Sequence, residues 1–91
     1  MVTVHLGSTY ADAIGEASLT VLVTGETTVL DLLAEIAETH PAIQPLWFRS
    51  NGQLRGHVEV AVNGTAIQEL QGPDTVIQSD AELTVKPALG C

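Results

Sequence analysis

The first residues alternate between apolar and polar side chains, a pattern typical of a β-strand with one buried face. In residues 2–6 the apolar positions are Val2, Val4 and Leu6. Residues 18–23 alternate in the same way, with the apolar positions Leu19, Val21 and Val23. The segment between them fits one helical turn that ends at Gly15. Because this connection is short, the two strands are expected to pair as an antiparallel hairpin.

The period changes after residue 28, where apolar side chains recur at steps of three and four residues. This spacing gives a helix one apolar stripe. The stripe consists of Val29, Leu32, Leu33, Ile36 and Ala37. Thr28 is expected to cap the start of the helix, with Asp31 three residues later as in a capping box. Pro41 is expected to end it, because the residue before a proline is biased away from helical geometry.

Residues 42–56 are expected to be irregular, with a turn at Asn51-Gly52. A strand follows, and its inward residues are Val58, Val60 and Val62. Asn63-Gly64 is a tight-turn pair, and Ala66-Ile67 reads as a very short strand. A long loop comes next, tied down by Leu70, Val76 and Ile77. The last strand, residues 81–87, turns Leu83 and Val85 inward.

The order of elements is strand, strand, helix, strand, short strand, strand. One amphipathic helix must cover one face of the sheet, because neither layer can bury its apolar side alone. A hairpin followed by a crossover helix and further strands predicts a mixed sheet of four to five strands, with the last strand beside the first. This is an α+β fold of the β-grasp, ubiquitin-like type. Residues 1–87 are the expected domain, and residues 88–91 are expected to be a flexible tail.

The composition narrows the classes of partner. The chain has 91 residues, a length that suits one domain, and its net charge is −8. Binding to nucleic acid or to an anionic membrane surface is disfavoured, whereas a basic protein partner is favoured. Equally, the charge could serve only solubility. The lone cysteine fits a reducing compartment, and no apolar run suits a signal peptide or membrane span, so a cytoplasmic location is expected.

No enzyme-like arrangement of side chains is visible. His5, His40 and His57 lack the spacing of a metal site. The glycine-rich motifs that bind nucleotides are absent. These absences disfavour a metal site and direct binding of a nucleotide.

Two features are candidates for partner docking. Trp47 and Phe48 could be docking anchors, because aromatic residues concentrate at interface hot spots, or they could plug the end of the helix or the sheet edge. The sheet face away from the helix is the better candidate. Its small and polar residues could bind a partner protein, or they could simply be exposed to solvent. They are expected to be His5, Glu59, Ala61, Thr84 and Lys86.

Four stretches in order resemble the ubiquitin-like sulfur carrier family, which includes the molybdopterin synthase small subunit and the thiamine-pathway sulfur carrier. They are "STYADAIG" (8–15), "TVLDLLAEIAETHP" (28–41), "VAVNG" (60–64) and "LQGPDTVIQSDAELTV" (70–85). The Val-Asn-Gly turn alone is weak, because many hairpins contain it. The ordered set covers essentially the whole chain.

The resemblance implies a function in which the tail is the working part. An activating enzyme uses ATP to adenylate the terminal carboxylate, and sulfur then displaces AMP to leave a thiocarboxylate. A biosynthetic enzyme accepts that sulfur. The resemblance therefore implies that the carrier is not itself an enzyme and binds no metal and no cofactor, because the activating enzyme supplies the nucleotide and the metal. Pro87, Ala88 and Leu89 would thread the partner's channel, and glycine suits the tip because it has no Cβ to clash. The rival interpretation is a ubiquitin-like binding module or protein tag that carries no sulfur.

The tail departs from the family's usual Gly-Gly end, because Cys91 follows Gly90. Three interpretations stay open. Cys91 could be an extension that a zinc metalloprotease removes, so that Gly90 becomes the sulfur-carrying terminus. It could be a substitution for the second glycine. It could also act directly, as a thiol or persulfide.

Overall fold

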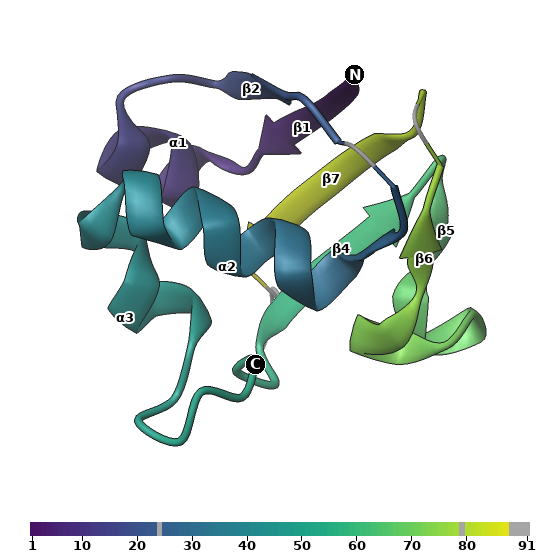
Figure 1. Cartoon of the computed structure of the whole chain (residues 1–91). Helices are drawn as coiled ribbons and strands as arrows, with labels where there is room; N and C mark the ends of the chain where they lie inside the picture. Colours follow the sequence, from purple (N-terminus) through teal and green to yellow (C-terminus); the bar gives the residue numbers. More distant parts are fainter. Residues whose placement is uncertain (24, 79, 88–91) are drawn as a thin grey trace.

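The computed structural model describes residues 1–23, 25–78 and 80–87. Five strands form one mixed sheet in the order β2-β1-β7-β4-β5 (Figure 1). β1 and β7 are parallel, and the other neighbouring strands are antiparallel. The strands are β1 (Val2–Leu6), β2 (Ser18–Val21), β4 (Val58–Val62), β5 (Thr65–Ala66) and β7 (Glu82–Pro87). The predicted pairing of the last strand with the first is confirmed.

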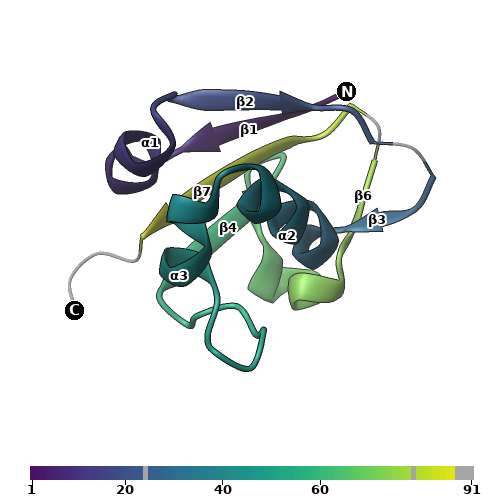
Figure 2. The same ribbon diagram turned by 60° about the vertical axis from the view of Figure 1, so that its left-hand side comes forward.

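Helix α2 lies across one face of this sheet, and α3 lies beside it (Figure 2). The helical segments are α1 (Ser8–Ile14), α2 (Val29–Thr39), α3 (Gln44–Trp47), η1 (Pro41–Ile43), η2 (Ile67–Glu69) and η3 (Gly72–Asp74), of which the η segments are 3-10 helices. A separate two-stranded ladder joins β3 (Thr27–Thr28) to β6 (Val76–Ile77). The architecture is the predicted α+β, β-grasp arrangement with one main helix on the sheet.

The main helix forms as the sequence predicts. The Thr28 side chain accepts a hydrogen bond from the backbone N–H of Asp31 at 3.2 Å, which satisfies one of the free donors at the helix start. The helix ends before Pro41, with His40 as its last cap. All five residues of the predicted stripe are buried against the sheet. Burial of this stripe holds the two layers together.

Two segments are more helical than predicted. α1 has seven residues where a single turn was expected. Gly15, at φ +92°, ends it by donating its N–H to the Ala11 carbonyl at 2.7 Å, a left-handed cap that favours glycine. Residues 42–47, expected to be irregular, lie in η1 and α3. Both helices are too short for apolar positions to recur over several turns, which is the signal that identifies a helix in a sequence.

Two strands end earlier than predicted, and β5 also begins one residue earlier. β2 ends at Val21, although the alternation continues to Val23. β5 ends at Ala66, and Ile67, which was assigned to it, is buried in η2 instead. Side-chain alternation does not limit a strand, because pairing with a neighbour decides where it ends.

The prediction that three apolar residues tie down the long loop is wrong for two of them. Leu70 is 44% exposed and Val76 is 42% exposed, and of the three Ile77 alone is buried. The buried Thr75 holds the segment instead. Its hydroxyl donates to the carbonyl of Gly72 at 2.7 Å within the loop. Its backbone carbonyl accepts from the N–H of Val29 at 2.9 Å, which attaches the loop to the start of α2.

Trp47 and Phe48 belong to the core. Trp47 is fully buried and its ring meets that of Tyr10 edge-on, with 5.7 Å between the ring centroids. Phe48 is also buried. The interpretation of these two residues as docking anchors is therefore wrong, since neither ring is available to a partner. They plug the space at the end of α2, as the alternative interpretation held.

The buried hydroxyl of Tyr10 gives a testable result. It has no hydrogen-bond partner among the described residues, and burial raises the pKa of the phenol. We expect Tyr10→Phe to leave the free energy of unfolding unchanged or to raise it by up to about 1 kcal/mol, because an unpaired buried hydroxyl costs desolvation energy. Urea denaturation at neutral pH measures this. A clear loss of stability would mean that the hydroxyl has a partner.

The same variant has a pH signature. The phenol of a tyrosine in the unfolded chain ionises at about pH 10. In the folded protein burial raises the pKa of the Tyr10 phenol, so it keeps its proton to higher pH. The stability that this residue contributes is thus complete below that pH and falls as the pH rises through the raised pKa of the folded state. The free energy of unfolding should therefore fall less for Tyr10→Phe than for the parent protein between neutral and strongly alkaline pH.

Candidate functional site

The face of the sheet away from α2 carries the residues that the sequence assigned to it. We call His5, Glu59, Ala61, Thr84 and Lys86 the open face. Thr84 of β7 lies between His5 of β1 and Ala61 of β4 in register. Glu59 and Lys86 are opposite each other on β4 and β7. The predicted alignment of these side chains on one face is therefore confirmed.

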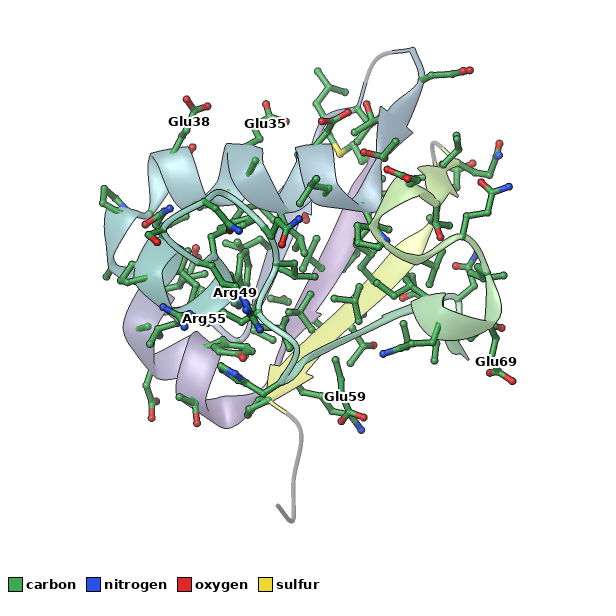
Figure 3. The ribbon with its side chains drawn as sticks, turned by 90° about the horizontal axis from the view of Figure 1, so that it is seen from below. Glu35, Glu38, Arg49, Arg55, Glu59 and Glu69 are labelled. Carbon is green, nitrogen blue, oxygen red and sulfur yellow. The ribbon has the colours of Figure 1, made fainter. Side chains whose placement is uncertain are left out.

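The open face contains a shallow hollow of about 270 Å³. Small residues shape it: Ala61, Gly64 and Ala66 all line it. Glu59 and Lys86 provide charge at its border, and Figure 3 shows Glu59 near the end of β7. A small-residue surface with a charged border can receive a protruding side chain of a partner, which a flat charged surface could not do.

The end of β7 is fixed on both sides. Pro87 is in register with Val58 of β4 on one side. On the other side the N–H of Gly7 donates to the carbonyl of Val85 at 2.8 Å. Pro87, the last described residue, therefore has a defined position in the sheet.

Gly7 makes this arrangement possible. A Cβ at this position would lie 2.9 Å from the Lys86 Cβ and 3.1 Å from the Pro87 Cδ. Carbon atoms do not approach so closely without displacement of one of them, and here the neighbour is the backbone-proximal part of β7. Sequence reasoning treated Gly7 only as the start of a connection. The signal that could have identified it is a glycine placed directly between a strand and a helix.

We expect Gly7→Ala to destabilise the protein by about 1–3 kcal/mol, the usual cost of overpacking, and to displace the end of β7. Gly56→Ala is the matched control, because a Cβ there meets nothing within 4 Å. Denaturant unfolding measures the first effect, and amide chemical shifts of residues 85–87 measure the second. Equal behaviour of the two variants would show that the close approach has no consequence.

The chain's three strong cations lie at or near this end of the sheet. Lys86 is on β7, and Arg49 and Arg55 lie in the segment between α3 and β4 (Figure 3). The Arg55 Nε donates to the Pro45 carbonyl at 2.8 Å, which holds that segment against α3. By contrast, Glu35 on α2 lies at the opposite edge of the molecule in this view.

The other predicted site residues fall into two groups. Pro87 is half-buried at the end of β7. Ala88, Leu89, Gly90 and Cys91 lie outside the described residues. Within residues 1–23, 25–78 and 80–87, no group of three or more metal-ligating side chains occurs. No helix in that part of the chain is both long and apolar enough to cross a membrane.

Comparison with known proteins identifies the family. The sequence model of the ThiS family matches residues 4–90. No curated protein sequence matches the chain. Among solved structures, small archaeal modifier protein 1 from Haloferax volcanii is similar, with 27% identity, a TM-score of 0.87, and coverage of 99% of this chain and 97% of that one.

Two further structures are similar. Small archaeal modifier protein 1 from Methanosarcina acetivorans has 25% identity and a TM-score of 0.86, over 99% of this chain and 94% of that one. A chain of the BexX/CysO complex from Amycolatopsis orientalis has 23% identity and a TM-score of 0.82, over 100% of this chain and 99% of that one. This last likeness is one of fold.

The chain belongs to the ThiS family. It is accordingly a ubiquitin-like protein of the sulfur carrier and modifier class, and not an enzyme. Proteins of this class bind no cofactor themselves. The resemblance noted in the sequence is thus confirmed at the level of family and fold.

Proposed function

We propose that the protein is a sulfur carrier and that Gly90 bears the sulfur. The Gly90 carboxylate attacks the α-phosphorus of ATP in an activating enzyme, and pyrophosphate leaves. Hydrosulfide then bonds to the acyl carbon, AMP leaves with one carboxyl oxygen, and a proton is released. The product is a C-terminal thiocarboxylate, whose sulfur a biosynthetic enzyme accepts.

The observation that carries this proposal is the family match, which extends from residue 4 through Gly90. The geometry around β7 supports it. A strand held between β1 and β4, with Gly7 packed under its last residues, gives the following segment a fixed point of departure. In this proposal Pro87, Ala88 and Leu89 form the threading tail. A processing metalloprotease removes Cys91, which frees the carboxylate of Gly90.

The open face is the proposed docking surface for the activating enzyme. Its central residue, Ala61, lies in the hollow, and Glu59 and Lys86 offer charges of both signs to a partner. The strand that carries Lys86 continues into the tail, so a partner bound here is adjacent to the segment that it must receive. The BexX/CysO complex supports the idea that a chain of this fold assembles with another protein.

Pyrophosphate exchange tests the adenylation step. The protein ending at Gly90 is mixed with its activating enzyme, ATP and labelled pyrophosphate, and label is expected to enter ATP only when the carrier is present. A protein ending at Leu89 is the matched control and should give no exchange. The form ending at Cys91 reports whether trimming is required. If the Gly90 form gives no exchange, the carboxylate is not activated and the proposal is wrong.

A second function is favoured by one observation. Two similar structures, at 27% and 25% identity, are named small archaeal modifier proteins. The protein would then be joined through its terminal glycine to lysine side chains of other proteins. Peptide mass spectrometry of the cells separates the two functions, because a tag leaves an isopeptide remnant on lysine, whereas a carrier leaves a thiocarboxylate on its own terminus.

A further inference from the structure

The groove between β2 and α2 is separate from the open face and from the end of β7. We propose that it binds an extended segment of a partner protein, with alternating apolar side chains and a basic residue beside them. The segment pairs with β2 as an additional strand of the sheet. This interaction does not depend on sulfur chemistry at the tail.

The outer edge of β2 is unpaired. β2 is the last strand of the sheet on its side, and β1 is its one partner among the described strands. The N–H of Leu6 donates to the carbonyl of Ala17 at 2.9 Å. Antiparallel pairs alternate in hydrogen bonding, so the backbone groups of Leu19 and Val21 also face β1. Those of Ser18 and Thr20 therefore face outward, where an added strand can bond to them.

This edge lacks the usual protection. Proteins shield edge strands by keeping them very short or by placing lysine, proline or a bulge on them. The opposite edge follows that rule, because β5 has two residues. β2 has four residues, and residues 16–23 contain no proline and no lysine. An unprotected edge of this kind is a template for strand addition.

The groove beside this edge has an apolar floor. It has a volume of about 430 Å³, and Leu19, Val21, Leu22 and Ile36 are its apolar residues. Leu19 and Val21 are half-buried, although Val4 and Val2, their partners on β1, are fully buried. Leu22 is 69% exposed, the largest fraction for a large apolar side chain in the described part of the chain. Apolar side chains of a partner would cover these exposed apolar residues and bury them further.

The charge of the groove specifies the occupant. Glu35 is the carboxylate that lines it, and Thr39 and His40 are the neighbouring polar side chains of α2 and its cap. Asp31 and Glu38 line a separate hollow on α2 and add to the negative charge of that helix. The three strong cations of the chain lie on other elements, namely β7 and the segment between α3 and β4. A basic residue next to an apolar strand therefore complements the groove. A second copy of this acidic chain does not, because its own β2 has no cation.

A peptide titration tests the proposal. The probe is the capped peptide Lys-Val-Thr-Ile-Thr-Val-Thr, together with versions that permute its Val and Ile, added to isotopically labelled protein. We expect amide shifts in residues 18–23 and 35–40. We also expect no binding by an N-methylated form of the peptide, which keeps the side chains but lacks donors on one edge. A side-chain interaction alone would tolerate that methylation.

Matched variants locate the site. Leu22→Asp and Glu35→Lys should each weaken peptide binding by about tenfold or more. Leu70→Asp and Glu69→Lys make the same chemical changes on η2 and the residue after it, and should have no effect. Equal losses from both pairs would overturn the proposal. So would shifts centred on the open face, absence of binding to every permuted peptide, or concentration-dependent self-association through β2 in the absence of peptide.

Discussion

We expect Ala61→Arg to lower the rate of pyrophosphate exchange with the proposed activating enzyme by about ten- to a hundredfold, the size expected when a central interface position is blocked. Ala61 lies in the middle of the open face, in register with Thr84, and lines its hollow. An arginine there extends into the space that a docked partner would occupy. Because the position faces away from the core, stability should change little.

The control for this variant is Ala34→Arg. Ala34 is exposed on α2, so the substitution adds the same side chain and charge on the other side of the molecule. Initial rates of pyrophosphate exchange at several carrier concentrations measure both variants, and denaturation curves establish that both are folded. If Ala34→Arg alone lost pyrophosphate exchange, the docking surface would be α2 and not the open face.

Trp47→Ala lowers the free energy of unfolding by about 3–5 kcal/mol, the usual cost of deleting a buried aromatic side chain. Small domains have a total stability of about 5–15 kcal/mol, so a large share is lost. The indole is fully buried and packs edge-on against Tyr10. Circular dichroism during urea denaturation measures the change without relying on the tryptophan signal.

This experiment also tests the assignment of Trp47 to the core. A docking anchor would lose partner binding with little change in stability, whereas a core residue loses stability first. Leu70→Ala is the comparison, because Leu70 is a large apolar residue that the structure leaves partly exposed. A stability loss of equal size in both variants would contradict the assignment of Trp47 to the core.

The sequence predicts well those elements whose apolar period is complete. α2 repeats its stripe over three turns and has a capping threonine, and both features appear in the structure. In β4, Val58, Val60 and Val62 are buried as the alternation predicts, and Asn63 and Gly64 adopt the positive φ values of a tight turn. Local sequence and tertiary packing agree at these places.

Prediction fails where tertiary contacts decide the outcome. Val76 is apolar yet 42% exposed, because β6 pairs with β3 at the rim of the molecule. Trp47 is equally apolar and is fully buried, because α3 packs beside α2. Nothing in the residues next to either one distinguishes these environments.

The candidate site divides in the same way. The residues of the open face follow from strand alternation, so the sequence could name them. The role of Gly7 depends on a close approach between the end of β1 and the end of β7, two segments at opposite ends of the chain. The groove beside β2 likewise requires the relative placement of a strand and a helix, which no local pattern contains.

Intact mass spectrometry of the protein purified from its own cells tests the central claim most directly. The account predicts a species that ends at Gly90 and is heavier than the plain acid by the difference between one sulfur and one oxygen atom. Treatment that hydrolyses thiocarboxylates should return it to the mass of the acid. A protein that retains Cys91, with no added sulfur under conditions of active sulfur metabolism, would contradict Gly90 as the sulfur-bearing residue.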